Sequence, residues 1–410
     1  MTTPRALPVT ALMVTEAAAA VAGRVVATPC TSSPALSALT GTTVFVKLEN
    51  LQRTGSFKDR GALRKLLSLD AAQRARGVVA MSAGNHGQGV AHQAAALGIP
   101  ATIVLPQGTP FTKVARTAQL GARVVVAGAS VAEAETVARE LASDEGSVFV
   151  HPYDDPLVVA GQGTVGLEIV EAVRDADVIV APVGGGGLLA GVAVAARAAA
   201  PHIELVGVQS ELFPAVSAAY HDVADVPRSR SISIADGIAV TEPGRVTLPM
   251  LRALVDDVTT VREASIEEAM THYLELEKTV AEGAGAAPLA LLLEQPDRFT
   301  GRRVVLVVSG GNVDPRVLSS VILRGLGRQG RLTRLYVETD DLPGQLARIA
   351  AVLGDAGANI VEVEHGRLAS EVAPRRARVS FVIETVDVDH AADVVDALGA
   401  AGFAVERQPL

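Results

Sequence analysis

The segment at residues 54–62, TGSFKDRGA, holds a lysine whose position suits covalent chemistry. It lies between a predicted strand and a predicted helix. With Ser56 as the cap of that helix, Lys58 falls in the first turn, near the positive end of the helix dipole, where an ammonium is disfavoured. A lysine that is easily kept neutral suits Schiff-base formation. Taken alone, the segment is better explained by an exposed helix lysine, so other motifs must decide.

A glycine run after another predicted strand could bind phosphate. Backbone N–H groups at a helix N-terminus attract anions, and glycines allow the anion to approach the backbone closely. The run also satisfies the dinucleotide pattern GxGxxG/A, which keeps a Rossmann-type dehydrogenase as an alternative. No GxxxxGK[ST] segment is present, which argues against a P-loop kinase or ATPase. The run consists of Gly184, Gly185, Gly186, Gly187 and Leu188.

Two further strand ends carry polar residues, SAGNHGQG at 82–89 and SGGN at 309–312. The hydroxyl, carboxamide and loop amides of the first could bind a carboxylate or a ring oxygen, whereas a purely structural Gly/Asn turn is the alternative. Because the carboxyl ends of parallel strands share one edge of a sheet, we expect Ser309 to face the same site. The candidate residues of the first segment are Ser82, Ala83, Gly84, Asn85 and His86.

A parallel sheet would bring these motifs together, and the chain alternates short β-branched runs with alanine-rich helical stretches, as such a sheet requires. Residues from about 20 to 325 are therefore predicted to form one α/β unit or two interleaved ones. The expected strands are 44–49, 78–83, 101–106, 122–128, 147–152, 178–183, 204–209 and 303–310. The expected helices include 87–97, 111–120, 130–142, 160–174 and 188–199.

The composition changes to Gly and Arg at residues 325–332, GLGRQGRL, which suggests a linker. Beyond it the pattern predicts a small ferredoxin-like domain with the order βαββαβ. Its expected elements are strand 333–339, helix 343–356, strands 359–365 and 376–386, helix 389–400 and strand 403–408.

Composition excludes several classes of protein. The 410 residues are 49% hydrophobic and 20% charged, which is enough apolar material for a large core and argues against a disordered chain. The formal net charge of −9 argues against a nucleic-acid partner. The single cysteine, Cys30, cannot form an internal disulfide, and no Cys/His pattern of a structural zinc site occurs. We therefore expect a cytoplasmic protein without a metal.

Two apolar stretches imitate export or membrane signals. The run at 6–14 is short and interrupted, and Thr15 after it is expected to cap a helix. Residues 178–196 carry no charge over a length that could span a bilayer, but Pro182 and the glycine run interrupt them. A buried strand, a loop and a helix explain this stretch better, so no membrane contact is expected.

The four motifs occur together in an order and spacing that resemble the pyridoxal-phosphate enzymes of the tryptophan synthase β type (fold type II), and among them the threonine ammonia-lyases. The resemblance covers nearly the whole chain. It implies a two-lobed parallel-sheet catalytic domain over residues 1–325, with a smaller lobe at about 45–155 inserted, a linker at 326–332 and a regulatory domain at 333–410.

The resemblance also implies roles for individual residues. Lys58 would bind pyridoxal 5'-phosphate covalently and then act as the base on the substrate Cα, while Phe57 packs beside the cofactor ring. Residues 184–188 would hold the cofactor phosphate. Asn85 would bond the 3-oxygen of the ring, and Ser309 the ring nitrogen. Ser82 and its neighbours would bind the substrate carboxylate. The implied reaction converts L-threonine, and also L-serine, to a 2-oxo acid and ammonia.

Differences from neighbouring families narrow the prediction. Ala83 stands where serine racemase-like members carry a second serine, so racemisation is not expected. Gln209 stands where those relatives begin a metal loop with glutamate, which argues against a divalent metal. Gly237 and Glu282 are weaker candidates for the substrate pocket. The alternatives are another fold type II enzyme, such as serine dehydratase or threonine synthase, and a non-catalytic amino-acid sensor.

The C-terminal stretch resembles an ACT domain, an amino-acid-sensing module. A single copy is typical of the medium-length threonine ammonia-lyases. We expect this chain to form a homodimer or homotetramer. Pro343 and Gly344 would shape a turn whose amides could hold an amino-acid effector. Dimerisation alone is the other function considered for this domain. The candidate effector residues are Asp341, Gly344, Asn359 and Ile360.

Overall fold

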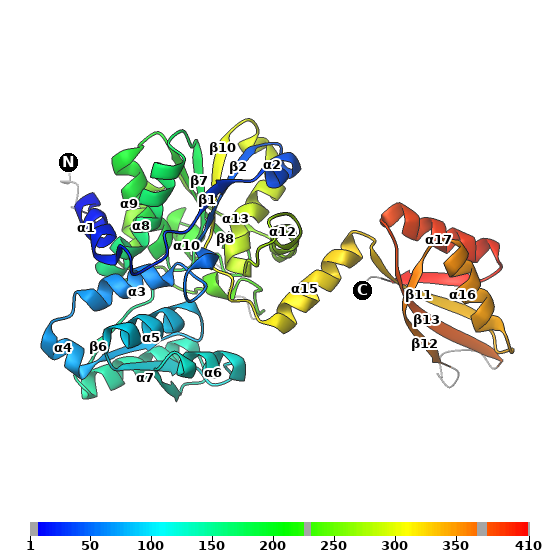
Figure 1. Ribbon diagram of the computed structural model, residues 1–410, viewed down its shortest axis with the longest axis horizontal. Coiled ribbons are helices and arrows are strands. Elements are labelled where there is room, and N and C mark those ends of the chain that lie inside the picture. Colours follow the sequence, from blue (N-terminus) through cyan, green and yellow to red (C-terminus); the bar gives the residue numbers. More distant parts are fainter. Residues whose placement is uncertain (1–6, 225–230, 367–374, 409–410) are drawn as a thin grey trace. The chain divides into compact units, whose positions relative to one another are not determined.

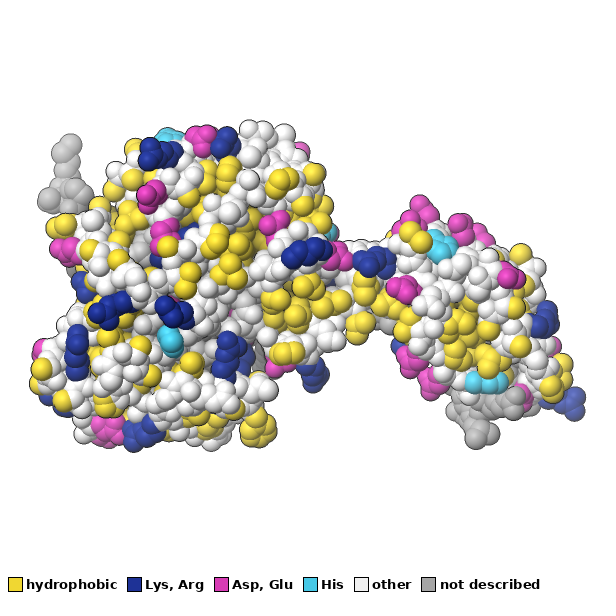
Figure 2. Space-filling view, in the orientation of Figure 1, with side chains coloured by type: hydrophobic (Ala, Val, Ile, Leu, Met, Phe, Trp, Pro, Cys, Tyr) yellow, Lys and Arg dark blue, Asp and Glu magenta, His cyan; other side chains and the backbone are white. Residues whose placement is uncertain are grey.

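The computed structural model describes residues 7–224, 231–366 and 375–408. The chain divides into two compact units, Met1–Val313 and Asp314–Leu410. Figure 1 shows the first unit as two lobes, each built around a sheet with helices on its faces. On the face seen in Figure 2, basic, acidic and hydrophobic side chains are intermixed over both units.

A six-stranded sheet forms the centre of the larger lobe. Its order is β1-β2-β10-β7-β8-β9, and every pair is parallel except β1 with β2. The carboxyl ends of β7 and β10 therefore lie side by side at one edge, which brings two of the motifs together. The strands are β1 (Cys30–Ser32), β2 (Thr43–Leu48), β7 (Val178–Pro182), β8 (Glu204–Ser210), β9 (Asp257–Val261) and β10 (Arg303–Val308).

Helices cover both faces of this sheet, and small residues let two of them approach closely. A Cβ added at Gly191 of α9 would lie 2.6 Å from the backbone nitrogen of Gly163 in α8, so both positions need glycine. The helices are α1 (Ala11–Val21), α2 (Pro34–Thr40), η1 (Glu49–Leu51), α8 (Pro156–Ala172), α9 (Gly187–Ala199), α10 (Ala215–Tyr220), η2 (Asp236–Ile238), α11 (Thr247–Leu254), α12 (Glu263–Leu276), α13 (Gly283–Glu294) and α14 (Pro296–Phe299).

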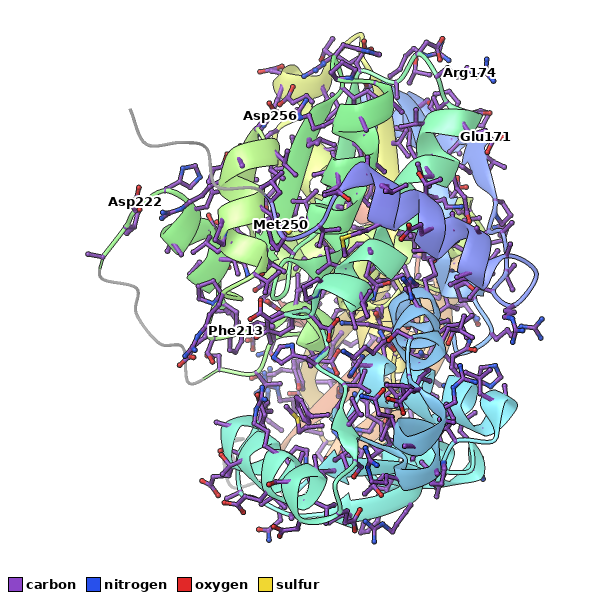
Figure 3. The ribbon with its side chains drawn as sticks, turned by 90° about the vertical axis from the view of Figure 1, so that its left-hand side faces the viewer. Glu171, Arg174, Phe213, Asp222, Met250 and Asp256 are labelled. Atoms are coloured by element: carbon purple, nitrogen blue, oxygen red, sulfur yellow. The ribbon has the colours of Figure 1, made fainter. Side chains whose placement is uncertain are left out.

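The smaller lobe has its own parallel sheet, in the order β5-β4-β3-β6. Figure 3 shows the two lobes from the side, with Met250 of α11 in the upper, larger one. The strands are β3 (Val78–Met81), β4 (Ala101–Leu105), β5 (Arg123–Val126) and β6 (Val148–Phe149). The helices are α3 (Lys58–Leu67), α4 (Ala71–Arg76), α5 (Asn85–Leu97), α6 (Phe111–Gln119) and α7 (Val131–Asp144).

The second unit contains the predicted βαββαβ order as an antiparallel sheet, β12-β13-β11-β14. Helix α15 (Pro315–Arg328) precedes it and runs into the segment expected as a linker at 326–332, so only residues 329–331 separate it from β11. The remaining elements are β11 (Leu332–Asp340), α16 (Gln345–Asp355), β12 (Asn359–Gly366), β13 (Arg376–Glu384), α17 (Val388–Ala400) and β14 (Ala404–Gln408).

Several expectations about local structure are wrong. Thr10, not Thr15, caps α1: its hydroxyl accepts from the backbone N–H of Met13, whereas Thr15 lies inside the helix. Ser56 does not cap α3, because Phe57 precedes Lys58 in helical conformation. The strand expected at 147–152 is only two residues long, and β1 and β9 were not predicted at all.

The uncharged stretch at 178–196 folds as a strand, a glycine loop and a helix, as expected. Among the described residues, no helix combines the length and apolar character needed to cross a bilayer.

Candidate active site

Lys58 is the first residue of α3, at the junction of the two lobes. Its amine donates to the carbonyl of Pro152 at 2.7 Å and lies 5.0 Å from the centroid of the Phe57 ring. Removal of the amine from water lowers its pKa to about 8, although Glu282 nearby opposes this shift. The neutral amine needed for bonding to a carbonyl is therefore accessible near neutral pH.

A buried ionic network fixes the helix that carries Lys58. The guanidinium of Arg60 is fully buried and pairs with Glu49 at 2.8 Å and Glu168 at 2.6 Å. Lys47 joins the same network through Glu168. Since these partners come from η1, α8 and β2, the network ties the start of α3 to the larger lobe. Arg60 thus positions the lysine two residues before it.

Ser309 follows β10 directly and is 2% exposed. Its carbonyl accepts from the backbone N–H of Phe57 at 3.0 Å, and Ser56 forms a β-bridge with Gly310. These backbone contacts hold the lysine segment against the serine segment, as the shared sheet edge predicted.

The glycine loop lies between β7 and the N-terminus of α9. Gly186 has φ +92°, a conformation that glycine adopts readily. Among the described residues, none of the backbone N–H groups at 184–188 donates to a backbone carbonyl. These free donors at a helix N-terminus have the arrangement that the predicted phosphate cradle requires.

Sequence reasoning missed the residues that support this loop. The ring of Tyr153 packs onto Gly185, where an added Cβ would lie within 3.0 Å of three ring atoms. Thr247 donates to the carbonyl of Gly185 at 2.5 Å, and Asp154 accepts from the backbone N–H of Val246 at 2.7 Å. The tyrosine and the aspartate belong to PYDD at 152–155, a polar segment after a short strand that could have drawn attention.

Asn85 begins α5, and its carboxamide is bonded at both ends. Its Nδ2 donates to Glu282 at 2.7 Å, and its Oδ1 accepts from Nδ2 of Asn312 at 2.7 Å. Glu282 is 5% exposed, and burial raises the pKa of its carboxyl to about 7. The structure therefore places the weak candidate Glu282 next to Asn85 and adds Asn312, to which no role was given.

The loop before α5 follows β3 of the smaller sheet, so this motif comes from a different sheet than the glycine loop and Ser309, and not from one shared edge as expected. Ser82 accepts from the backbone N–H of Gly84 at 3.1 Å, and Ala83 and Gly84 are half-buried. The His86 side chain turns away from the loop: it is 2% exposed, and Nε2 donates to the carbonyl of Val150 at 2.9 Å. Burial lowers the pKa of His86 to about 3, so the ring stays neutral.

Gly237 approaches the site from the larger lobe. An added Cβ there would lie 3.7 Å from Glu282, and its carbonyl would lie 3.2 Å from a Cβ added at Gly184. Gly237 thus borders both the glycine loop and Glu282.

The candidate effector residues lie in the second unit, which is described by itself. Gly344 has φ +88° and immediately precedes α16, as the turn prediction required. The Asp341 backbone N–H donates to the carbonyl of Arg375 at 2.9 Å. Asn359 donates to Glu384 at 3.2 Å, and Ile360 packs against the core of this unit.

The residues present fit pyridoxal phosphate. The site combines an amine of lowered pKa, a cradle of free N–H groups, and an asparagine and a buried serine on neighbouring segments. A phosphate, an aldehyde and a ring with polar edges would find matching groups here. In the described part of the chain, no group of three or more His, Cys, Asp or Glu residues is arranged to hold a metal ion.

Comparison with known proteins agrees with this geometry. Residues 21–310 match the family described as pyridoxal-phosphate dependent enzymes. The chain belongs to this family. The match rules out the alternative that this segment is a Rossmann-type dehydrogenase. The cofactor is pyridoxal phosphate. Residues 333–403 match the ACT domain.

Two similar proteins are named for threonine deamination. The L-threonine ammonia-lyase of Thermotoga maritima is 43% identical over 91% of this chain and 93% of its own. The catabolic L-threonine dehydratase of Escherichia coli is 43% identical over 77% of this chain and 96% of its own.

Solved structures are similar to the first unit. A threonine deaminase from Solanum lycopersicum is 32% identical, with a TM-score of 0.72 over 76% of this chain and 86% of its own. Maize serine racemase is 34% identical, with a TM-score of 0.72 over 78% of this chain and 98% of its own.

Proposed function

We propose that this enzyme is an L-threonine ammonia-lyase that converts L-threonine to 2-oxobutanoate and ammonia and also accepts L-serine. The observation that carries the proposal is the placement of the Lys58 amine beside Pro152, whose neighbour Tyr153 packs on the glycine loop, while Asn85 of the 82–86 segment approaches Gly310 next to Ser309. Relatives named for threonine deamination, each 43% identical, support the choice of substrate.

The protein groups have separate tasks in this proposal. Pyridoxal phosphate, when bound, withdraws electrons from the substrate Cα. The Lys58 amine takes the Cα proton, for which its lowered pKa suits it. The amides and hydroxyl of the 82–86 loop bind the substrate carboxylate. Loss of the β-hydroxyl as water leaves an enamine, which takes up water again and releases ammonia and the 2-oxo acid.

The ring environment favours elimination over transamination. A neutral serine hydroxyl at 309 does not stabilise a protonated ring nitrogen as a carboxylate would. A carbanion at Cα is then less stabilised, which favours prompt departure of the β-hydroxyl. Ala83 has no group that could carry a proton to the opposite face of Cα, so racemisation is not part of the proposal.

The experiment is product analysis with purified, cofactor-loaded protein. Incubation with L-threonine should release 2-oxobutanoate and ammonia in equal amounts, and L-serine should release pyruvate and ammonia. Formation of neither 2-oxo acid, while the amino acids still perturb the cofactor absorbance, would refute the lyase and favour a β-replacement enzyme or a sensor.

The proposal extends to regulation, assembly and location. An amino acid is expected to bind near Gly344 of the ACT domain and to change activity. The enzyme is expected to act as a cytoplasmic homodimer or homotetramer. The support is the ACT match and the left-handed turn at Gly344 before α16.

A further inference from the structure

A directional chain of hydrogen bonds runs from Thr54 to Glu282 through two asparagines. Nδ2 of Asn312 donates to the carbonyl of Thr54 at 2.6 Å and to Oδ1 of Asn85 at 2.7 Å. Nδ2 of Asn85 then donates to Glu282 at 2.7 Å. The four residues come from separate segments, so the chain forms only in the folded protein.

The two ends decide how both carboxamides are oriented. The carbonyl of Thr54 can only accept, so it must face the amide nitrogen of Asn312. That nitrogen can only donate, so it must face the oxygen of Asn85. The Asn85 nitrogen is thereby turned toward Glu282. Only the ionised carboxylate of Glu282 offers acceptors alone, because the protonated form also carries an O–H donor. One N–H of Asn85 is used by Glu282, and the other is left for a ligand.

Glu282 is placed where its charge matters. Its backbone N–H donates to the carbonyl of Gly310 at 3.0 Å, next to Ser309. The charged groups that act on it are Asp236 of η2 and Lys113 of α6, which pair at 2.7 Å, while Glu282 itself acts on Lys58 of α3. Among these groups, Asp236 disfavours the carboxylate and Lys113 favours it.

We infer that Glu282 is a positioning residue that, in its ionised form, holds the free N–H of Asn85 toward the 3-oxygen of the bound cofactor. This inference rests on the proposed assignment of Asn85 to the cofactor 3-oxygen and does not depend on the identity of the substrate. The cofactor oxygen is an acceptor, so it needs the nitrogen end of Asn85 and not the oxygen end. A protonated Glu282 could donate to the Asn85 oxygen, which would favour a flipped carboxamide. The flipped amide nitrogen would then face the nitrogen of Asn312, donor against donor, and the amide oxygen would face and repel the cofactor oxygen.

The inference predicts an acidic limit on cofactor binding. Burial, followed by the charge of Asp236, raises the pKa of Glu282 to about 7, so the carboxylate is lost as the pH falls below that value. Cofactor affinity and the visible absorbance of the bound cofactor should change over the same range. Neither readout requires a substrate.

Charge variants of Asp236 and Lys113 test the inference through the direction in which the pH midpoint shifts. Loss of packing would not produce shifts of opposite direction. Asp236→Asn should move the midpoint of this pH dependence to lower pH, and Lys113→Met should move it to higher pH, because they remove opposite influences. Glu282→Gln should flatten the dependence because the amide does not titrate. Glu294→Gln, at the other end of α13, is the matched control and should behave like the unmodified protein.

The experiment measures the dissociation constant of pyridoxal phosphate and its bound spectrum from pH 5.5 to 8.5, with the melting temperature of each cofactor-free variant as a folding control. Glu282→Ala should weaken binding by roughly 10- to 100-fold, as expected for loss of a hydrogen bond to a charged group. An unchanged midpoint in both neighbour variants, or an undiminished acidic limit in Glu282→Gln, would overturn the inference. Absence of threonine turnover with these shifts intact would refute only the proposed function.

Discussion

Substitution of Gly185 by alanine tests whether the close approach of Tyr153 shapes the phosphate cradle. The new methyl group would lie within 3.0 Å of three ring atoms of Tyr153, and the carbonyl of Gly185 is held by Thr247. Either the ring or the loop must move. Overpacking of this kind costs about 1–3 kcal/mol. If the loop moves, the cost falls on cofactor binding as a roughly 5- to 140-fold weaker affinity.

A double-mutant cycle separates this explanation from a general loss of stability. Tyr153→Ala removes the ring that the methyl group meets, so the double variant should bind pyridoxal phosphate more tightly than Gly185→Ala alone. The assay is titration of cofactor-free protein followed by cofactor absorbance, with thermal unfolding in parallel. Gly354→Ala, where an added Cβ meets nothing within 4 Å, is the control. Additivity of the two single effects within about 0.5 kcal/mol would refute the reasoning.

Other parts of the account make separate predictions. Since the pKa of Lys58 is about 8, its neutral form at pH 7 is about 300-fold more abundant than that of a lysine with a pKa of 10.5. The rate of covalent cofactor binding should therefore level off above pH 8. A rate that still rises at pH 10 would contradict this prediction. Glu49→Ala should lower the free energy of unfolding by about 3–5 kcal/mol in denaturant titrations, because it removes a partner of buried Arg60. Glu135→Ala, at a partly exposed pair with Arg139, should cost under about 1 kcal/mol, and equal losses in the two variants would refute a special role of burial. Isoleucine or valine should shift the activity and melting temperature, and no effect of either would remove the support for sensing by the ACT domain.

The sequence was sufficient for those features that depend on local pattern. The glycine loop is recognisable because strand, glycines and helix are contiguous, and the lysine lies in the first turn of its helix as expected. The helix boundaries agree to within a few residues: α5 begins at Asn85 instead of 87. The βαββαβ order of the second unit followed from alternation of hydrophobic periods.

Contacts between distant segments could not be predicted in the same way. Asn85 and Glu282 are separated by 197 positions, and nothing in the spacing of either motif indicates that they meet. The packing of Tyr153 on Gly185 likewise depends on how the loop before α8 returns to the sheet edge. Ser56 shows the converse error, in which a residue with good capping propensity is placed by the bridge to Gly310 instead.

The most direct test of the central claim compares Lys58→Ala with Lys65→Ala. Both lysines lie in α3, but Lys65 pairs with Asp155 at 2.6 Å, outside the site. With L-threonine and saturating pyridoxal phosphate, Lys65→Ala should release 2-oxobutanoate and ammonia as the unmodified enzyme does. Lys58→Ala should lose both this turnover and the absorbance of the covalently bound cofactor. Release of 2-oxobutanoate by Lys58→Ala at the unmodified rate would contradict the account.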